Sequence, residues 1–262
     1  MDICGLQFNL TWENRAANFA AVAQLLSQAT PALAPGSLLV LPELFASGFS
    51  MDVSRAADSA AAETEHFLAA LAQQYRVTVL GGVARQLPCG RGANEALAFD
   101  PSGTLLCRYR KIHSFSPVGE NHAYQAGSAL AHFSWNGFRV APLICYDLRF
   151  PEVFRASPAD LFCVIASWPD RRQNHWSTLL QARAIENQAF VLGLNRCGSD
   201  PHASYAGGSL LLDPQGHILA AAGDSPVLLR TAISPDTATA WRAAFPALRD
   251  RRRDLFPSAP PA

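Results

Sequence analysis

Short apolar runs alternate with amphipathic stretches along the whole chain. The apolar runs end at Pro, Gly or polar residues, as is typical of buried strands. They are residues 2–8, 37–43, 77–85, 138–145, 161–168 and 189–196. Between them, residues 13–29 carry Val22 and Leu26 at helical spacing, and residues 61–75 and 174–188 have a similar pattern. The chain is therefore predicted to alternate between strands and helices.

Two β-hairpins interrupt this alternation. The first joins residues 93–99 to 104–111 through Asp-Pro-Ser-Gly, and the second joins 207–213 to 217–220 through Pro-Gln-Gly. Strands that alternate with helices in both halves predict an α/β fold, and the hairpins make its sheets mixed. The similar order of elements in the two halves predicts a two-sheet sandwich with helices outside. Pro142 counts against the strand predicted at 138–145, because proline is unusual in a central strand.

Composition and charge exclude several classes of protein. The chain has 262 residues, 49% of them hydrophobic, without a break in composition, so we expect a single domain over 1–262 with a frayed tail at about 257–262. With 21 basic and 21 acidic side chains, no general attraction to nucleic acid or anionic membranes is expected. The basic cluster at 249–254 is interrupted by acids, which favours a solvated or subunit-contact segment. No apolar run reaches the roughly 18 residues that span a bilayer.

The cysteines and the N-terminal segment indicate the compartment. No two cysteines form a C-x-x-C pair, so we expect neither structural zinc nor another metal or cofactor. The N-terminal segment lacks the features of a signal peptide, which favours reduced thiols and a cytoplasmic location. The six cysteines are Cys4, Cys89, Cys107, Cys145, Cys163 and Cys197.

Cys145 lies at the end of one predicted buried strand. Asp147 is a good N-cap residue and Pro151 a good first-turn residue, so a helix is predicted to begin just beyond it. Amide N–H groups and the positive end of a helix dipole are then expected near the sulfur. Such a setting favours thiolate, the nucleophilic form of cysteine.

Two other reactive side chains follow apolar strands in the same way. Glu43 ends the run L-L-V-L-P-E, and Lys111 ends the run L-L-C-R-Y-R-K. Functional groups of α/β sheets gather beyond strand ends, so these residues are expected to meet Cys145 in one pocket. A glutamate can accept the thiol proton, and an ammonium can stabilise an oxyanion while the sulfur forms a thioester. Taken singly, the two charges would be surface residues and the thiol an inert core residue.

The segments around these residues resemble signature sequences of the carbon–nitrogen hydrolase (nitrilase) superfamily. They read L-P-E-L, R-K-I-H and C-Y-D-L-R-F-P-E, in the order of that family's Glu-Lys-Cys triad. The resemblance continues through Q-A-R-A-I-E-N-Q and covers nearly the whole chain. It implies a four-layer α-β-β-α sandwich and hydrolysis of non-peptide C–N bonds. By this resemblance, Glu43 is the base, Lys111 the oxyanion stabiliser and Cys145 the nucleophile.

A second glutamate often supports the site in that family. Glu120, in G-E-N-H-A-Y-Q-A-G, matches it, which implies that it positions Lys111 or the hydrolytic water; the alternative is a solvated loop residue. The chain is most similar to the omega-amidase branch, which hydrolyses 2-oxoglutaramate and 2-oxosuccinamate. Nitrilases usually carry Trp after the nucleophile, so Tyr146 also favours an amidase. Many omega-amidases read K-I-H-L-F-D where this chain has Ser114 and Ser116, a departure that bears on the packing of this loop and not on the triad.

The substrate carboxylate requires a cation or hydrogen-bond donors. Arg149 is our hypothesis for this role, with a salt bridge or backbone brace as the alternative. We also expect Tyr146, Trp168 and His175 to contact the substrate, although His175 also fits a helix end. His113 or His175 beside the nucleophile would instead make a Cys-His pair.

The sequence thus predicts a metal-independent cysteine amidase acting on a small omega-amido 2-oxo acid. The same superfamily leaves open another amidase, a carbamoylase or a nitrilase, and a non-catalytic scaffold subunit is the alternative of another class. We interpret Arg183, Glu186 and Asn187, which share one helical face, as a buried polar brace. Resemblance to the family implies a homodimer that assembles through helices flanking the active-site strand and through the C-terminal region.

Overall fold

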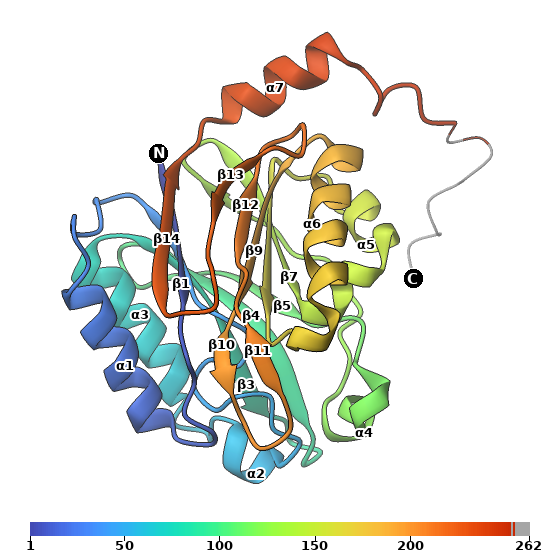
Figure 1. Cartoon of the computed structure of the whole chain (residues 1–262). Coiled ribbons are helices and arrows are strands. Elements are labelled where there is room, and N and C mark those ends of the chain that lie inside the picture. Colours follow the sequence, from blue (N-terminus) through green and yellow to red (C-terminus); the bar gives the residue numbers. More distant parts are fainter. Residues whose placement is uncertain (253, 255–262) are drawn as a thin grey trace.

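Two six-stranded mixed sheets pack face to face in the computed structural model, which describes residues 1–252 and 254 (Figure 1). The first sheet has the order β14-β1-β2-β3-β4-β5, with β1, β2 and β3 parallel and the other pairs antiparallel. Its strands are β1 (Asp2–Gln7), β2 (Leu38–Val40), β3 (Thr78–Gln86), β4 (Gly92–Phe99), β5 (Leu105–Arg110) and β14 (Val227–Ala232). The tail predicted at 257–262 lies outside the described residues.

The second sheet repeats this arrangement with the order β13-β12-β9-β8-β7-β6. Here β7, β8 and β9 are parallel, and the other neighbours are antiparallel. Its strands are β6 (Phe133–Trp135), β7 (Phe138–Ile144), β8 (Leu161–Ala166), β9 (Phe190–Asn195), β12 (Leu210–Leu212) and β13 (Ile218–Ala221). A separate hairpin, not predicted from the sequence, consists of β10 (Cys197–Ser199) and β11 (Ser204–Ala206).

Helices form the two outer layers. Figure 1 shows α1 and α3 over the first sheet and α5 and α6 over the second, which confirms the predicted α-β-β-α sandwich. The helices are α1 (Arg15–Ser27), α2 (Val53–Ala56), α3 (Glu63–Tyr75), α4 (Glu120–Ala123), α5 (Pro151–Ala156), α6 (Gln173–Asn187) and α7 (Pro235–Ala244). Single 3-10 turns are η1 (Ser116–Val118), η2 (Cys145–Arg149) and η3 (Asp170–Arg172).

The alternating side chains of β2 show how the sequence determines which face of a strand packs against which layer. Leu38 and Val40 pack into the core between the sheets, whereas Leu39 and Leu41 pack toward α1 and α3. Burying one such side chain contributes about 1.5–3 kcal/mol. Because both faces of the strand are buried, a shift of its register by one residue would exchange the two sets of side chains. The position of the strand end, and of Glu43 just beyond it, is therefore well determined.

Pro142 is accommodated because one side of its strand is open. β7 pairs with β6 only from Phe138 to Val140, so Pro142 lies beyond the last paired residue on that side. On the other side it is in register with Cys163 of β8. The strand predicted at 138–145 is thus confirmed, with Pro142 at a locally free edge.

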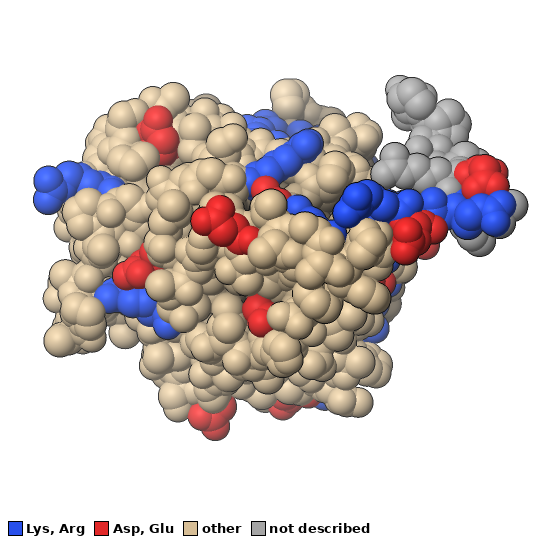
Figure 2. Space-filling model, turned by 90° about the horizontal axis from the view of Figure 1, so that it is seen from above, with Lys and Arg blue, Asp and Glu red and all other residues tan. Residues whose placement is uncertain are grey.

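Surface charge, the state of the cysteines and the length of the helices complete the description of the fold. In the view of Figure 2, charged side chains of both signs are scattered over a mostly uncharged face. All six cysteines are free, as predicted. None of the helices in the described part of the chain is long and apolar enough to cross a bilayer.

Candidate active site

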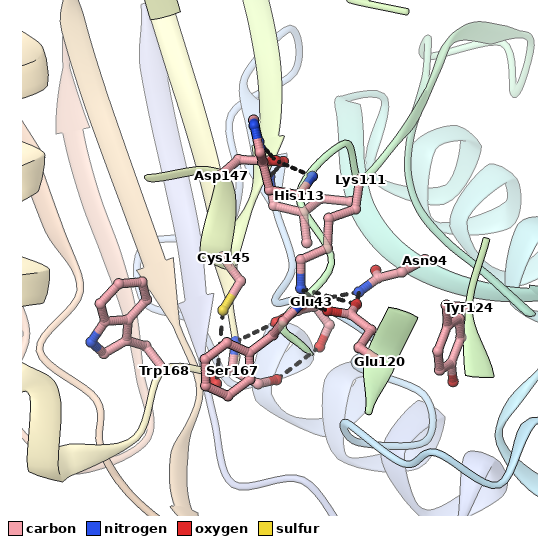
Figure 3. A network of polar contacts seen from close by, with 12 residues as sticks. Glu43, Asn94, Lys111, His113, Glu120, Tyr124, Cys145, Asp147, Ser167 and Trp168 are labelled. Atoms are coloured by element: carbon pink, nitrogen blue, oxygen red, sulfur yellow. Dashed lines mark hydrogen bonds and ion pairs between the residues drawn. The ribbon is translucent and has the colours of Figure 1, made fainter. Parts of the chain in front are cut away.

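The three residues that end apolar strands come together between the sheets (Figure 3). Lys111 follows β5, and its Nζ donates to Oε1 of Glu43, which follows β2, at 3.0 Å. Cys145 comes from the opposite sheet, directly after β7. Ser167 links the two sides, because its N–H donates to Oε2 of Glu43 at 2.8 Å and its carbonyl lies 4.0 Å from the Cys145 sulfur. The sequence therefore places a carboxylate, an ammonium and a thiol in one site.

Glu120 completes the buried charge cluster from the first turn of α4. The Lys111 Nζ donates to both of its oxygens, at 3.0 Å and 2.9 Å. The N–H of Phe115 also donates to Glu120. Glu120 is 1% exposed, so the solvated-loop alternative is wrong, and its carboxylate holds the lysine rather than facing solvent.

Asn94 belongs to this cluster, although the sequence interpretation missed it. Its Nδ2 donates to Oε1 of Glu43 at 2.8 Å and to Oε1 of Glu120 at 3.0 Å, while its Oδ1 is buried and accepts no hydrogen bond. Oε1 of Glu43 thus accepts two hydrogen bonds, from Asn94 and Lys111, whereas Oε2 accepts one, from the N–H of Ser167. The sequence did contain a hint of this role, because Asn94 lies on the same face of β4 as Ala96 and Ala98 and is the polar residue of that inward-facing row.

The carboxylates of this buried cluster determine the protonation state of Lys111. Burial alone lowers the pKa of this ammonium, but the carboxylates of Glu120 and Glu43 outweigh burial and raise it above its usual value. The lysine is therefore a fixed positive charge beside the thiol. Its Nζ also lies 5.1 Å from the centre of the Phe49 ring, which closes one side of the site.

Cys145 occupies a sharp turn with φ of +47°, a backbone conformation that is uncommon for a residue with a side chain. Burial and the negative charge of Glu43 raise the pKa of its thiol well above the usual value, and Lys111 opposes them only in part. The prediction that this position favours thiolate is therefore wrong. The resting thiol is protonated, and it requires a base to become a nucleophile.

Asp147 has a different role from the predicted helix cap. Phe150 is the N-cap of α5, and Asp147 instead accepts hydrogen bonds from the Tyr109 hydroxyl at 2.7 Å and the Ile144 N–H at 3.1 Å. The His113 N–H and ring Nδ1 also contact it, at 3.0 Å and 2.9 Å. Tyr109 belongs to the first sheet and Ile144 to the second, so Asp147 ties the segment around Lys111 to the turn of the nucleophile.

No histidine contacts the sulfur among the described residues. His113 is held by Asp147 and stacks on Phe150 with ring centres 3.7 Å apart. His175 is exposed on α6, and its Nδ1 lies 3.3 Å from an Arg149 nitrogen. The Cys-His alternative thus finds no support in the geometry.

A cavity of about 550 Å³ opens onto Cys145. Tyr146, Trp168 and Arg149 line it, as expected for residues that contact a substrate, whereas the described lining does not include His175. The Arg149 guanidinium carbon lies 4.8 Å from the centre of the Trp168 ring. Within the described residues it forms no ion pair, so the salt-bridge alternative for Arg149 is wrong.

A polar brace supports the turn of the nucleophile from α6. The buried Arg183 side chain donates twice to the carbonyl of Leu148, at 2.8 Å and 3.1 Å, and pairs with Glu186 at 3.0 Å. The Asn187 side chain donates to the carbonyl of Arg183 at 2.9 Å. The predicted brace is therefore confirmed.

Comparison with known proteins agrees with this geometry. The model of the carbon-nitrogen hydrolase family matches residues 3–243. The chain is 40% identical to omega-amidase YafV of Yersinia enterocolitica, with 96% of each protein covered. It is 34% identical to 2-oxoglutaramate amidase of Bacillus subtilis (strain 168), with 84% of this chain and 86% of that protein covered.

A solved structure shows the same architecture. It is a CN-hydrolase superfamily protein from Xanthomonas campestris with an arsenic adduct in its active site. The TM-score is 0.88 at 32% identity, with 96% of this chain and 97% of that one covered. The chain belongs to the carbon–nitrogen hydrolase family and is a hydrolase that acts on carbon–nitrogen bonds.

Proposed function

We propose that this chain is an omega-amidase that converts 2-oxoglutaramate or 2-oxosuccinamate into the corresponding dicarboxylate and ammonia. One observation carries the proposal: Cys145, supported by the buried Glu43–Lys111 pair, faces a cavity that contains Arg149, which forms no ion pair within residues 1–252 and 254. The sulfur can attack an amide carbon while the guanidinium holds a carboxylate of the same molecule. The similarity to omega-amidase YafV and to 2-oxoglutaramate amidase supports this choice of substrate.

The first half-reaction transfers the acyl group to sulfur. Oε2 of Glu43 takes the thiol proton of Cys145 as the sulfur attacks the amide carbon, and the new oxyanion is stabilised by the Lys111 ammonium. When the C–N bond breaks, Glu43 returns the proton to nitrogen. Ammonia leaves, and the acyl group remains on the sulfur as a thioester.

The second half-reaction uses the same groups with water. Glu43 removes a proton from a water molecule that attacks the thioester carbon, and Lys111 again stabilises the oxyanion. The C–S bond then breaks and the proton passes to sulfur. The products are the free thiol of Cys145 and a carboxylic acid, which loses its remaining proton to solvent and becomes the carboxylate. Glu120 keeps the ammonium in place through both steps by its paired contacts with Lys111.

Turnover of defined amides tests the proposal. Purified enzyme should release ammonia and 2-oxoglutarate from 2-oxoglutaramate, and the Cys145→Ser variant should lose at least about a thousandfold of that rate. Acid-quenched enzyme should carry the mass of the acyl group on Cys145. Turnover of N-carbamoyl amino acids, nitriles or deaminated glutathione, without turnover of 2-oxoglutaramate, would identify another substrate. An unreactive Cys145 without turnover of any amide would favour a scaffold protein.

We further propose that the chain is one domain that forms a cytoplasmic homodimer. The exposed Ile185 on α6 and Phe245 beyond α7 provide apolar contacts on the side expected to assemble. Six free thiols are compatible with a reducing compartment. Light scattering on the purified protein measures the subunit number directly, and a monomer at micromolar concentration would contradict the dimer.

A further inference from the structure

A second arginine lines the cavity without an acidic partner. Besides Arg149, the cavity wall contains Arg172 of η3. Among the described residues, the Arg172 guanidinium forms no hydrogen bond or ion pair, and the only polar contact of the Arg149 side chain is with His175. Arg55 and Arg171 also line the wall; Arg55 is paired with Glu13 at 2.8 Å, and Arg171 is exposed. Within the described residues, Arg149 and Arg172 are therefore the two partly buried guanidinium groups of the wall that have no acidic partner.

Aromatic rings hold Arg172 without using its hydrogen-bond donors. Its guanidinium carbon lies 5.0 Å from the centre of the Phe115 ring, and Phe115 packs edge-on against Tyr146 at 5.0 Å. The Trp168 ring nitrogen donates to the Arg172 carbonyl at 2.8 Å, which fixes the backbone at the cavity wall. The same Trp168 ring supports Arg149. Stacking of this kind leaves the N–H groups in the guanidinium plane free for an acceptor.

The two cations affect one another. Burial, together with the positive charges of Arg171 and Arg149, lowers the pKa of Arg172. Like charges repel in a partly buried site, and the groups that oppose this repulsion at Arg172 are Cys145 and Tyr146 rather than a carboxylate. A ligand that presents negative charge and hydrogen-bond acceptors, and no positive charge, would relieve this repulsion.

We propose that Arg172 is a specificity-determining residue that, with Arg149, binds the 2-oxo acid end of the substrate and disfavours the corresponding amino acid. This inference rests on the proposed omega-amidase function. A 2-oxo acid offers only acceptors at this end, namely two carboxylate oxygens and the 2-oxo oxygen, which match the donors of two guanidinium groups. Glutamine has an ammonium group at the same carbon, so it would bring a third positive charge and further donors against Arg172.

Three amides with the same reacting group test this assignment. 2-Oxoglutaramate has a 2-oxo oxygen, glutaramate has a methylene at that carbon, and glutamine has an ammonium. For the Arg172→Met variant we expect kcat/KM for 2-oxoglutaramate to fall about 10- to 100-fold, as for the loss of a hydrogen bond to a charged group. The value for glutaramate should fall less and that for glutamine should not fall, so the preference for the 2-oxo acid decreases.

The neighbouring arginine provides a matched control. Arg171 lines the same cavity and carries the same charge, but it is exposed and, among the described residues, its guanidinium stacks on no aromatic ring. The Arg171→Met variant should keep the wild-type ratio of kcat/KM for 2-oxoglutaramate over glutaramate within about twofold. Arg172→Lys keeps the charge but loses the planar fork, so its ratio should lie between those of wild type and Arg172→Met. If Arg172→Met does not fold, the lysine variant gives the answer.

The outcomes separate the two proposals. An Arg172→Met or Arg172→Lys enzyme that is active and keeps the wild-type preference for 2-oxoglutaramate over glutaramate would overturn the role of Arg172 while leaving the omega-amidase function intact. A wild-type enzyme that turns over none of the three amides would overturn the function itself. Equal loss of preference in the Arg171→Met control would show that general positive charge, not Arg172, sets the specificity.

Discussion

The two sheets bring opposite kinds of chemistry to the cavity. On the side of the first sheet, Glu43 and Lys111 are fully buried, and each charge contacts another buried polar group. On the side of the second sheet, Cys145, Arg149 and Arg172 are partly exposed and face the cavity without an acidic hydrogen-bond partner among the described residues. The first side is thus held together by its own hydrogen bonds, whereas we expect the substrate to complete the second.

This contrast predicts different consequences for changes on the two sides. A change in the preassembled cluster removes a partner from a buried charge, so it should damage both stability and chemistry. A change on the cavity side removes a group that has no acidic partner among the described residues, so it should affect substrate binding and leave the folded protein stable. Each prediction below tests one part of this division.

The largest effect is expected from Glu43→Gln, which removes the base and keeps the side-chain shape. Turnover of 2-oxoglutaramate should fall at least about a thousandfold. The negative charge of Glu43 contributes to the raised pKa of Cys145, so its removal should lower that pKa. The pH midpoint of Cys145 alkylation by iodoacetamide, followed by peptide mass spectrometry, should therefore move to lower pH while hydrolysis is lost. An unchanged midpoint would mean that the two residues are not electrostatically coupled.

A second prediction compares cations on the two sides. Lys111→Met leaves Glu43 and Glu120 buried without their common partner, and it should reduce the free energy of unfolding by about 3–5 kcal/mol. Arg149→Met should leave stability within about 0.5 kcal/mol of wild type and instead raise KM for 2-oxoglutaramate. Urea unfolding and steady-state kinetics measure the two effects. Equal stability of both variants would remove the distinction between the sides, and an unchanged KM would exclude Arg149 from carboxylate binding.

The sequence predicted the positions of Glu43, Lys111 and Cys145 because local patterns determine them. Each follows an apolar run that is long enough to identify a strand and ends at a clear boundary. The sheet edges then bring the strand ends together, as in other α/β folds. The family resemblance added Glu120, which no local pattern would have selected.

The remaining parts of the site depend on contacts between the sheets, which a local pattern does not contain. Asp147 satisfies the local rule for a cap, and it accepts from the Ile144 N–H at the start of η2, but its hydrogen bond from Tyr109 comes from the first sheet. The raised pKa of Cys145 results from burial and from charges far away in sequence, so the dipole argument alone gave the wrong direction. The roles of Asn94 and of Arg172, which has no ion pair in the described part of the chain, could be recognised only from their surroundings in the fold.

The smallest effect is expected for Asn94, which bridges the two carboxylates that Lys111 also joins. Asn94→Leu keeps the volume and removes one donor from Glu43 and one from Glu120, while Lys111 continues to pair with both. It also removes a buried acceptor that has no partner, so the loss of stability should be partly offset.

We therefore expect kcat/KM for 2-oxoglutaramate to fall only about tenfold, without a change in KM, for the loss of about one hydrogen bond to a charged group. Asn94 is not part of the described lining of the cavity, so the lost donor acts on the carboxylates and the whole loss should appear in kcat. A rise in KM with an unchanged kcat would contradict this expectation and assign Asn94 to substrate binding. A fall in kcat alone would show that the preassembled side of the site acts on the chemical step, in contrast to the cavity side, where Arg149→Met should raise KM.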